Sequence, residues 1–148
     1  MGKKVMENYG YFLSLHRYYI WATRLKGLFT EAINKNQVTD EITWASDLGL
    51  FMSHWYGALF VVVEGYRELG LHDIKVDNLL KSENVELLRR FRNGTFHFQN
   101  NYYDNRFVDF WRDSQDTAQW VHNLNLALGE FCLKKIEEEK EKRAHQGG

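Results

Sequence analysis

The segment of this sequence best suited to chemistry is Arg92-Asn93-Gly94-Thr95-Phe96-His97, in which a histidine follows an arginine by five positions. A guanidinium presents a fixed fork of donors that matches the oxygens of a phosphate. An imidazole, whose ordinary pKa is about 6.5, exchanges protons near neutral pH. Together these groups suit metal-independent cleavage of RNA, in which a base removes the 2′-hydroxyl proton and a cation neutralises the phosphorane.

Residues on either side of this segment are candidates for binding the substrate. Arg89 and Arg90 precede it and could supply a local basic patch, while Tyr102 and Tyr103 follow it and are available to stack on bases. The whole chain has a net charge of −1, which is unlike a general nucleic-acid binder. Any contact with RNA must therefore come from this local patch.

The arginine–histidine spacing is not specific by itself, because Arg67 and His72 stand in the same relation. Arg67 is followed by Glu68, an acid that would repel a phosphate, whereas Arg92 is followed by Asn93. We therefore predict a structural role for Arg67 and His72.

Other chemistries have no matching pattern here. The sequence contains no Walker motif, no GxGxxG and no GxSxG. No two of the six histidines stand four apart, and none follows a glutamate by three. Cys132 is the only cysteine, so it can form neither a zinc cluster nor an intramolecular disulfide. We expect no metal and no cofactor.

The same features predict a cytoplasmic protein. A single cysteine fits a reducing compartment, and the N-terminal residues lack the apolar run of a signal peptide. The most apolar stretch, Trp55 to Val63, is too short to span a bilayer and is expected to be a buried helix segment, with no membrane partner.

Long helices should position these side chains, because proline is absent and the apolar spacing is helical. Apolar stripes predict one helix over 11–33 and a second over 48–69, separated by a turn over 34–38 with Thr39 or Asp40 as the next N-cap. The first stripe consists of Tyr11, Leu15, Tyr18, Ala22, Leu25, Phe29 and Ile33. In the second helix, Gly49, Gly57 and Gly65 recur every eight residues and predict a close approach of another helix.

The second half of the chain carries shorter segments. We expect a loop over 70–78, then a third helix that Ser82 or Asn84 caps and that Asn93-Gly94 ends. The later segments are a connection over 99–105, a short helix over 107–111, and a last helix that begins near Asp116. Because 148 residues fit one domain, the fold class is all-α: a single-domain bundle of four to five helices over 1–148, with a charged helix tail at about 137–148.

The arginine, the polar residue after it and the histidine five positions on resemble the R-x4-6-H motif of the HEPN (higher eukaryotes and prokaryotes nucleotide-binding) domain family. The resemblance covers most of the chain in architecture and six residues in motif. Members are helical bundles, often metal-independent endoribonucleases of toxin–antitoxin, CRISPR and phage-defence systems, and they work as dimers with the two motifs facing each other.

The resemblance implies a role for each residue of the motif. His97 would be the general base or acid, Arg92 the phosphate clamp and Asn93 an orienting hydrogen-bonder. The products would carry a 2′,3′-cyclic phosphate and a 5′-hydroxyl. RNA would be the substrate, a second copy of the chain would complete a homodimer, and an antitoxin or another protein would be a further partner.

Five residues of continuous helix rotate by about 140°, so Arg92 and His97 would point apart. Either Gly94 breaks the helix and lets the two side chains converge, or a dimer brings His97 to the other copy's arginine. In the purely structural interpretation, His97 is a half-buried core residue and Arg92 pairs with Glu86 or Asp104.

Three further histidines, His16, His54 and His122, are expected to be core residues, and Glu64 is expected either to pair with an arginine or to face a dimer cleft. Two rival functions stay open. One is a catalytically inactive HEPN-like module that binds a nucleotide or a protein, and the other is a plain structural helical dimer.

Overall fold

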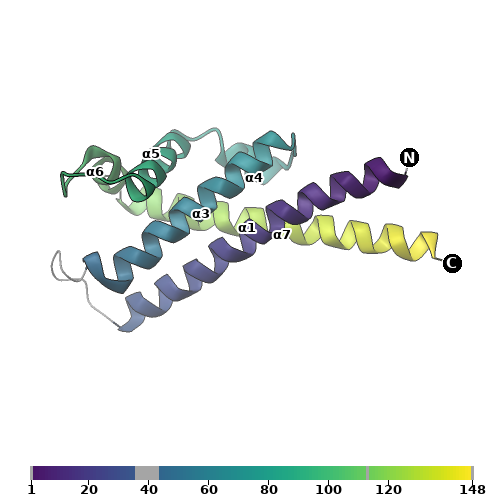
Figure 1. Cartoon of the computed structure of the whole chain (residues 1–148), viewed down its shortest axis with the longest axis horizontal. Helices are drawn as coiled ribbons and strands as arrows, with labels where there is room; N and C mark the ends of the chain where they lie inside the picture. The colour runs from purple at the N-terminus through teal and green to yellow at the C-terminus, as the bar shows by residue number, and fades with distance from the viewer. Residues whose placement is uncertain (1, 36–43, 113, 148) are drawn as a thin grey trace.

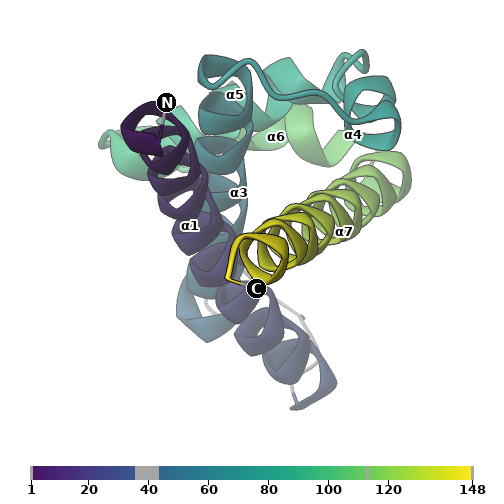
Figure 2. The same ribbon diagram turned by 90° about the vertical axis from the view of Figure 1, so that its right-hand side faces the viewer.

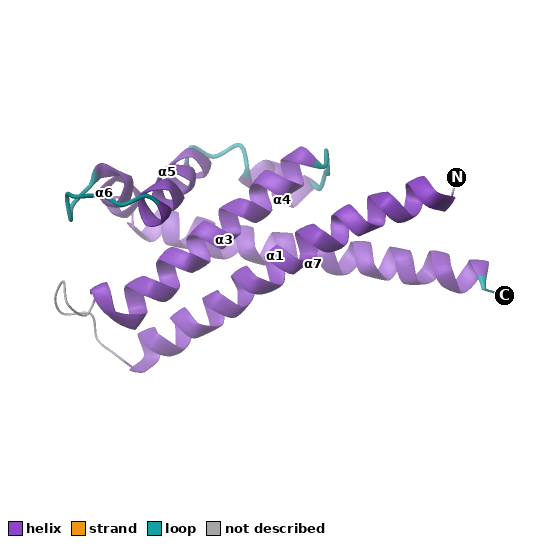
Figure 3. Ribbon diagram, viewed as in Figure 1, coloured by secondary structure: helices purple, strands orange, loops and turns teal. Residues whose placement is uncertain are grey.

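The computed structural model describes residues 2–35, 44–112 and 114–147, and within these ranges the chain contains helices and no strand (Figures 1 and 3). In chain order the elements are α1 (Gly2–Lys35), η1 (Trp44–Leu48), α3 (Gly49–Glu68), α4 (Ile74–Leu79), α5 (Asn84–Phe96), α6 (Asn105–Arg112) and α7 (Ser114–Gln146). The all-α helical bundle predicted from the sequence is confirmed. The predicted cap at Thr39 or Asp40 lies outside the described residues.

Three long helices form the frame of the bundle. α1 and α3 lie side by side, and α7 packs on them at an angle, as Figure 2 shows. α5 packs on α3, α6 packs on α5, and α4 packs on α7. The N-terminal part of α1 and the C-terminal part of α7 project together beyond the other helices, so both termini lie at one end of the molecule (Figure 1).

The core is built on the stripe predicted for the second helix. Its members are all buried or nearly so in the structure: Leu48, Met52, Trp55, Leu59, Val62, Tyr66 and Leu69. Burial of each such side chain contributes about 1.5–3 kcal/mol. A buried amide joins the three long helices, since Asn125 accepts a hydrogen bond from the Trp55 indole at 3.0 Å and donates to the Thr23 hydroxyl at 3.3 Å. Polar partners in the core thus fix the relative placement of α1, α3 and α7.

Two glycines of α3 let neighbouring helices approach closely, as their spacing predicted. A Cβ atom on Gly57 would lie 2.5 Å from Phe96 Cε2, and one on Gly65 would lie 2.7 Å from Leu15 Cδ1. Gly57 therefore admits the end of α5, and Gly65 admits α1.

The stripe predicted for the first helix is confirmed only in its middle. Leu15 and Ala22 are buried, but Tyr11 and Ile33 at its two ends are 58% and 48% exposed, and Phe12 is buried instead. The ends differ because α1 extends past the helices that cover its centre (Figure 1).

The loop predicted over 70–78 is correct for residues 70–73 but wrong from Ile74, where α4 begins. The Asp73 carboxylate caps this helix by accepting a hydrogen bond from the Val76 amide at 3.0 Å. Six residues are too few to show a helical period, so the apolar pattern could not reveal this helix. The preceding Gly70, with φ of 62°, adopts the left-handed conformation that ends α3.

The predicted end of the third helix at Asn93-Gly94 is also wrong. α5 continues through Gly94 to Phe96, and Gly94 is buried. A Cβ atom there would lie 3.0 Å from Phe107 Cζ and 3.1 Å from Arg106 Cβ. Glycine occupies this position because α6 packs against it, and not because the backbone needs a left-handed turn.

The segment Ser46–Glu68 is long and apolar enough to cross a membrane by length and composition. A core helix of a bundle has the same properties, and 56% of the apolar window is buried here against the other helices. The buried side chains of α3 belong to the core of the bundle.

Candidate functional site

Arg92 is held in a fixed position near the end of α5, against α3. Its Nη1 donates to Glu64 Oε1 at 2.7 Å, and its Cζ atom lies 4.5 Å from the centroid of the Phe60 ring. Its Nε and Nη2 donate to Asn93 Oδ1 at 3.3 Å and 3.2 Å. The side chain is only 22% exposed. These contacts use three of the five guanidinium N–H groups and leave two for a ligand.

His97 is the first residue after α5, and its side chain is exposed. Its backbone is extended, with φ of −120° and ψ of 129°, and its amide donates to Asn93 O at 3.1 Å. Within the part of the chain that the structure describes, the imidazole makes no hydrogen bond. The neighbouring Phe96 and Phe98 are 55% and 93% exposed. The half-buried core position considered for His97 is therefore wrong.

The two side chains do not meet within one protomer. Because α5 is unbroken at Gly94, Arg92 points toward α3 while His97 lies beyond the helix end. The convergence expected from a helix break at Gly94 does not occur. The other arrangement considered for bringing an arginine and a histidine together, contact with a second copy of the chain, is not affected by this finding.

The acids suggested as partners of Arg92 pair with other arginines. Glu86 accepts from Arg89 Nε at 2.9 Å, and this hydrogen bond lowers the pKa of the Glu86 carboxyl. Asp104 accepts from Arg106 at 3.3 Å. Glu64 pairs with Arg92, which is one of the two alternatives predicted for this glutamate.

The predicted basic patch carries less positive charge than expected. Arg89 pairs with Glu86, and Arg90 Nη1 lies 2.8 Å from Asp109 Oδ2. Both arginines adjoin the motif on α5, but each is neutralised by a neighbouring carboxylate. A paired arginine offers less net positive charge to a phosphate, so we expect these two arginines to contribute less to RNA binding than unpaired ones would.

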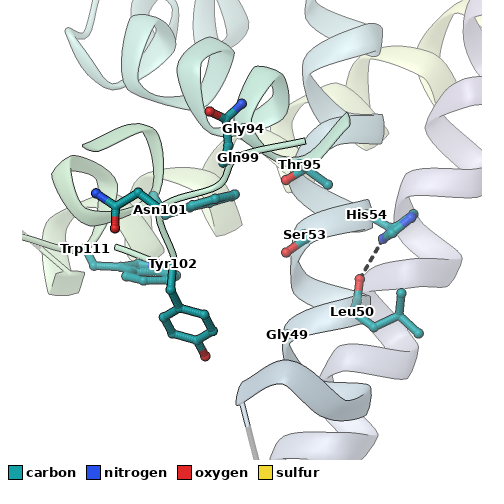
Figure 4. A pocket seen from close by; sticks show the side chains of 11 residues that line it. Gly49, Leu50, Ser53, His54, Gly94, Thr95, Gln99, Asn101, Tyr102 and Trp111 are labelled. Atoms are coloured by element: carbon teal, nitrogen blue, oxygen red, sulfur yellow. Dashed lines mark hydrogen bonds between the residues drawn. The ribbon is translucent and has the colours of Figure 1, made fainter. Parts of the chain in front are cut away.

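An open cleft of about 360 Å³ lies between α3, the end of α5, the following connection and α6 (Figure 4). Gly94 and Thr95 of the motif form part of its wall. Tyr102 lines it too, whereas Tyr103, whose ring contacts that of Tyr102 at 5.1 Å between centroids, is not among the lining residues. No spacing in the sequence indicates the other lining residues, because they come from segments far apart along the chain: Gly49, Leu50, Ser53, His54, Gln99, Asn101, Phe107 and Trp111.

His54 lies at the edge of this cleft rather than in the core. Its Nδ1 is 2.9 Å from Leu50 O, as Figure 4 shows. Its ring meets the Phe96 ring edge-on, at 5.5 Å between centroids. Among the other two predicted core histidines, His16 is half-buried beside aromatic rings, but His122 is exposed. The prediction for His122 is wrong because that side of α7 is not covered.

The second arginine–histidine pair is built differently. Arg67 is exposed in the last turn of α3, and His72 Nδ1 lies 3.3 Å from Asp77 Oδ2. The Tyr66 hydroxyl donates to Asp77 Oδ1 at 2.7 Å, and this hydrogen bond lowers the pKa of the Asp77 carboxyl. Arg67 and His72 line a shared hollow of about 320 Å³ together with that carboxylate.

Among the described residues, no three His, Cys, Asp or Glu side chains are placed to hold a metal ion together. Compared with known proteins, the chain matches no family model, no curated protein and no solved structure.

Proposed function

We propose that this chain is a metal-independent endoribonuclease of the HEPN type that acts as a homodimer. The observation that carries the proposal is the arrangement at the end of α5. The Arg92 guanidinium is fixed by Asn93, Glu64 and Phe60, and the His97 imidazole is exposed and makes no hydrogen bond within the described residues. A fixed cation and an accessible imidazole are the two groups that the reaction needs.

In the proposed reaction, the His97 imidazole removes the proton of a 2′-hydroxyl, and that oxygen attacks the adjacent phosphorus. The bond from phosphorus to the 5′-oxygen breaks, and the departing oxygen takes a proton from a second acid. The products are a 2′,3′-cyclic phosphate and a 5′-hydroxyl. Arg92 neutralises the phosphorane with its two unused N–H groups, and Asn93 keeps the guanidinium oriented.

The same surface supports the proposed homodimer. Phe96 and Phe98 flank His97 with large exposed rings, and aromatic side chains are enriched in the buried centres of protein interfaces. Two copies that meet here would cover both rings and bring the two motifs together. The histidine of the second copy would then serve as the second acid.

The biological setting of the proposal rests on the family resemblance of the motif. An RNA-cleaving HEPN protein would act in the cytoplasm as a toxin or phage-defence effector, with an antitoxin or another protein as its regulator.

A specific observation favours a second candidate, a catalytically inactive HEPN-like module that binds a nucleotide or a protein. Arg89, Arg90 and Arg92 are each paired with a carboxylate, so little free positive charge remains at the end of α5. A nuclease that releases its product also needs little affinity for RNA, so weak RNA binding fits both candidates. Cleavage therefore has to be measured directly.

The deciding experiment incubates mixed RNA in EDTA with wild type, Arg92→Ala and His97→Ala. Wild type should cleave and leave 2′,3′-cyclic phosphate ends, and each variant should lose about 10²- to 10⁴-fold in rate. Arg112→Ala is the charge-matched control, since this arginine is 73% exposed on α6 and should be dispensable. Circular dichroism checks the fold of each variant. No cleavage by folded wild type, or equal cleavage by Arg92→Ala and His97→Ala, would favour the binding module.

A further inference from the structure

The residues that line the cleft beside the motif suit a flat aromatic ligand with polar groups on its edge. Tyr102, Phe107 and Trp111 supply ring surface, and Ser53, Thr95 and Asn101 supply polar atoms. In Figure 4, the Ser53 and Thr95 hydroxyls face the connection that carries Asn101 and Tyr102. Its volume of about 360 Å³ lies at the small end of the range for ligand sites, which suits one nucleotide better than a larger ligand.

Several polar groups of the cleft are held in place before any ligand binds. Gln99 connects two elements, since its Nε2 donates to His97 O at 2.9 Å and its Oε1 accepts from Arg106 Nη1 at 2.7 Å. Asn101 Oδ1 accepts from the Tyr103 amide at 3.1 Å, which leaves the Asn101 NH₂ as a donor. Fixed groups bind a ligand at a smaller entropic cost than mobile ones.

Thr95 complements that donor with an acceptor. Its hydroxyl donates to Phe91 O at 3.1 Å, so the oxygen keeps its lone pairs for a hydrogen bond from a ligand. The cleft therefore offers both a fixed donor and a fixed acceptor next to aromatic rings. A nucleobase presents donors and acceptors on its edge and a ring face for stacking, and it matches this set of groups.

The cleft lies close to the motif along α3. Phe60 contacts Arg92, and Ser53, seven residues earlier on the same helix, lines the cleft. At 1.5 Å per residue the two positions are about 10 Å apart along the helix. A single RNA strand with its scissile phosphate at Arg92 would thus pass a neighbouring base over the cleft.

From this arrangement we infer that the cleft binds one unpaired RNA base that flanks the cleavage position and so gives the enzyme its sequence preference. The inference rests on the proposed function for the position of the scissile phosphate. The binding of a base in the cleft is a separate property, and it can be measured without cleavage.

The test uses His97→Ala protein, which keeps the cleft and should not cleave. Fluorescence anisotropy measures the affinity of four labelled hexaribonucleotides, one for each base. Wild-type cleft residues should favour one base by at least about fivefold. Tyr102→Ala should weaken that binding about tenfold, because it removes a stacking surface. Asn101→Asp should change the preferred base, because it keeps the acceptor for the Tyr103 amide but removes the donor.

Trp21→Ala is the control, since it deletes a similarly exposed aromatic side chain on α1 that does not line the cleft. It should leave affinity and preference unchanged. Equal affinity for the four oligomers, or equal effects of Tyr102→Ala and Trp21→Ala, would overturn the inference. The two proposals can fail separately. A base preference in a protein whose wild type does not cleave RNA would support base binding in the cleft and contradict the nuclease proposal. Cleavage by wild type without any base preference would support the nuclease proposal and contradict base binding in the cleft.

Discussion

The two arginine–histidine pairs of this chain share one spacing and one position, because each spans the C-terminal end of a helix that packs in the bundle. Arg92 is 22% exposed and bonded to Glu64 and Asn93, whereas Arg67 is exposed. For the histidines the order is reversed, because the side chain with a polar partner belongs to the second pair. The His72 ring lies 3.3 Å from the Asp77 carboxylate, and the His97 ring makes no hydrogen bond within the described residues.

This difference shows that the neighbours of such a pair, and not its spacing, set what it can do. At the end of α5 the cation is held by its neighbours and the imidazole is exposed. At the end of α3 the cation is exposed and the imidazole lies against an acid that also accepts from Tyr66. We therefore place the proposed chemistry at the first pair and expect a structural role for the second.

Among substitutions outside the two pairs, we expect the largest differences at Gly57 and Gly65 of α3, where an added Cβ atom would meet Phe96 and Leu15. Gly57→Ala would push Phe96, the residue before His97, and misplacement of a reacting group can cost up to about 10²-fold in rate. We expect cleavage to fall at least about tenfold with little loss of thermal stability, because the Phe96 ring is exposed and can move.

Gly65→Ala should do the opposite. Its new Cβ would meet the buried Leu15 side chain, so unfolding should require about 1–2 kcal/mol less while cleavage is retained. Thermal melts and cleavage rates of both variants test the contrast. If the two substitutions changed both the thermal stability and the cleavage rate equally, the expected contrast would be wrong.

A smaller effect is expected from Tyr66→Phe, which removes the hydroxyl that donates to Asp77. Loss of this hydrogen bond should lower the free energy of unfolding at pH 7 and leave cleavage unchanged. Because the bond lowers the pKa of Asp77 in the folded state, its stabilisation is present above the ordinary carboxyl pKa of about 3.9 and is lost as the pH falls through the lowered value.

The stability difference between wild type and Tyr66→Phe should therefore shrink below about pH 4. Denaturant melts at pH 7, 4 and 3 measure it. A stability difference that is constant over this range would show that the hydrogen bond does not act on Asp77. A loss of cleavage in Tyr66→Phe would indicate that the second pair, and not the first, takes part in the reaction.

The smallest effect is expected from Glu64→Gln, which removes the charge that pairs with Arg92. The freed guanidinium should bind RNA a few-fold more tightly, with a steeper dependence on salt concentration. Glu68→Gln, one turn further along α3, is the control. Affinity measured at two salt concentrations decides the point, and weaker binding by Glu64→Gln would mean that the carboxylate is needed to orient Arg92.

The sequence predicted the frame of the molecule well because long helices carry a repeated signal. The stripe on α3 and the pairing of Glu64 with an arginine were both predictable. α4 was missed because a helix of six residues shows no period, and its cap at Asp73 is one residue among many similar polar ones.

The site was less predictable, because its geometry depends on contacts between distant segments. Gly94 looked like a helix end, but its local sequence does not show that Phe107 packs against it. The cleft likewise combines α3 with a connection some fifty residues later, and no spacing rule places Ser53 opposite Asn101. The sequence indicated Arg92 and His97 as candidates, but it suggested Glu86 or Asp104, and not Glu64, as the acid that pairs with Arg92.

The most direct test of the account compares His97→Ala with His72→Ala in the same RNA cleavage assay in EDTA. We predict that His97→Ala loses at least about 10²-fold in rate while His72→Ala stays within twofold or so of wild type, with both proteins folded. Equal rates for the two variants, or a larger loss in His72→Ala, would contradict the assignment of catalysis to the end of α5.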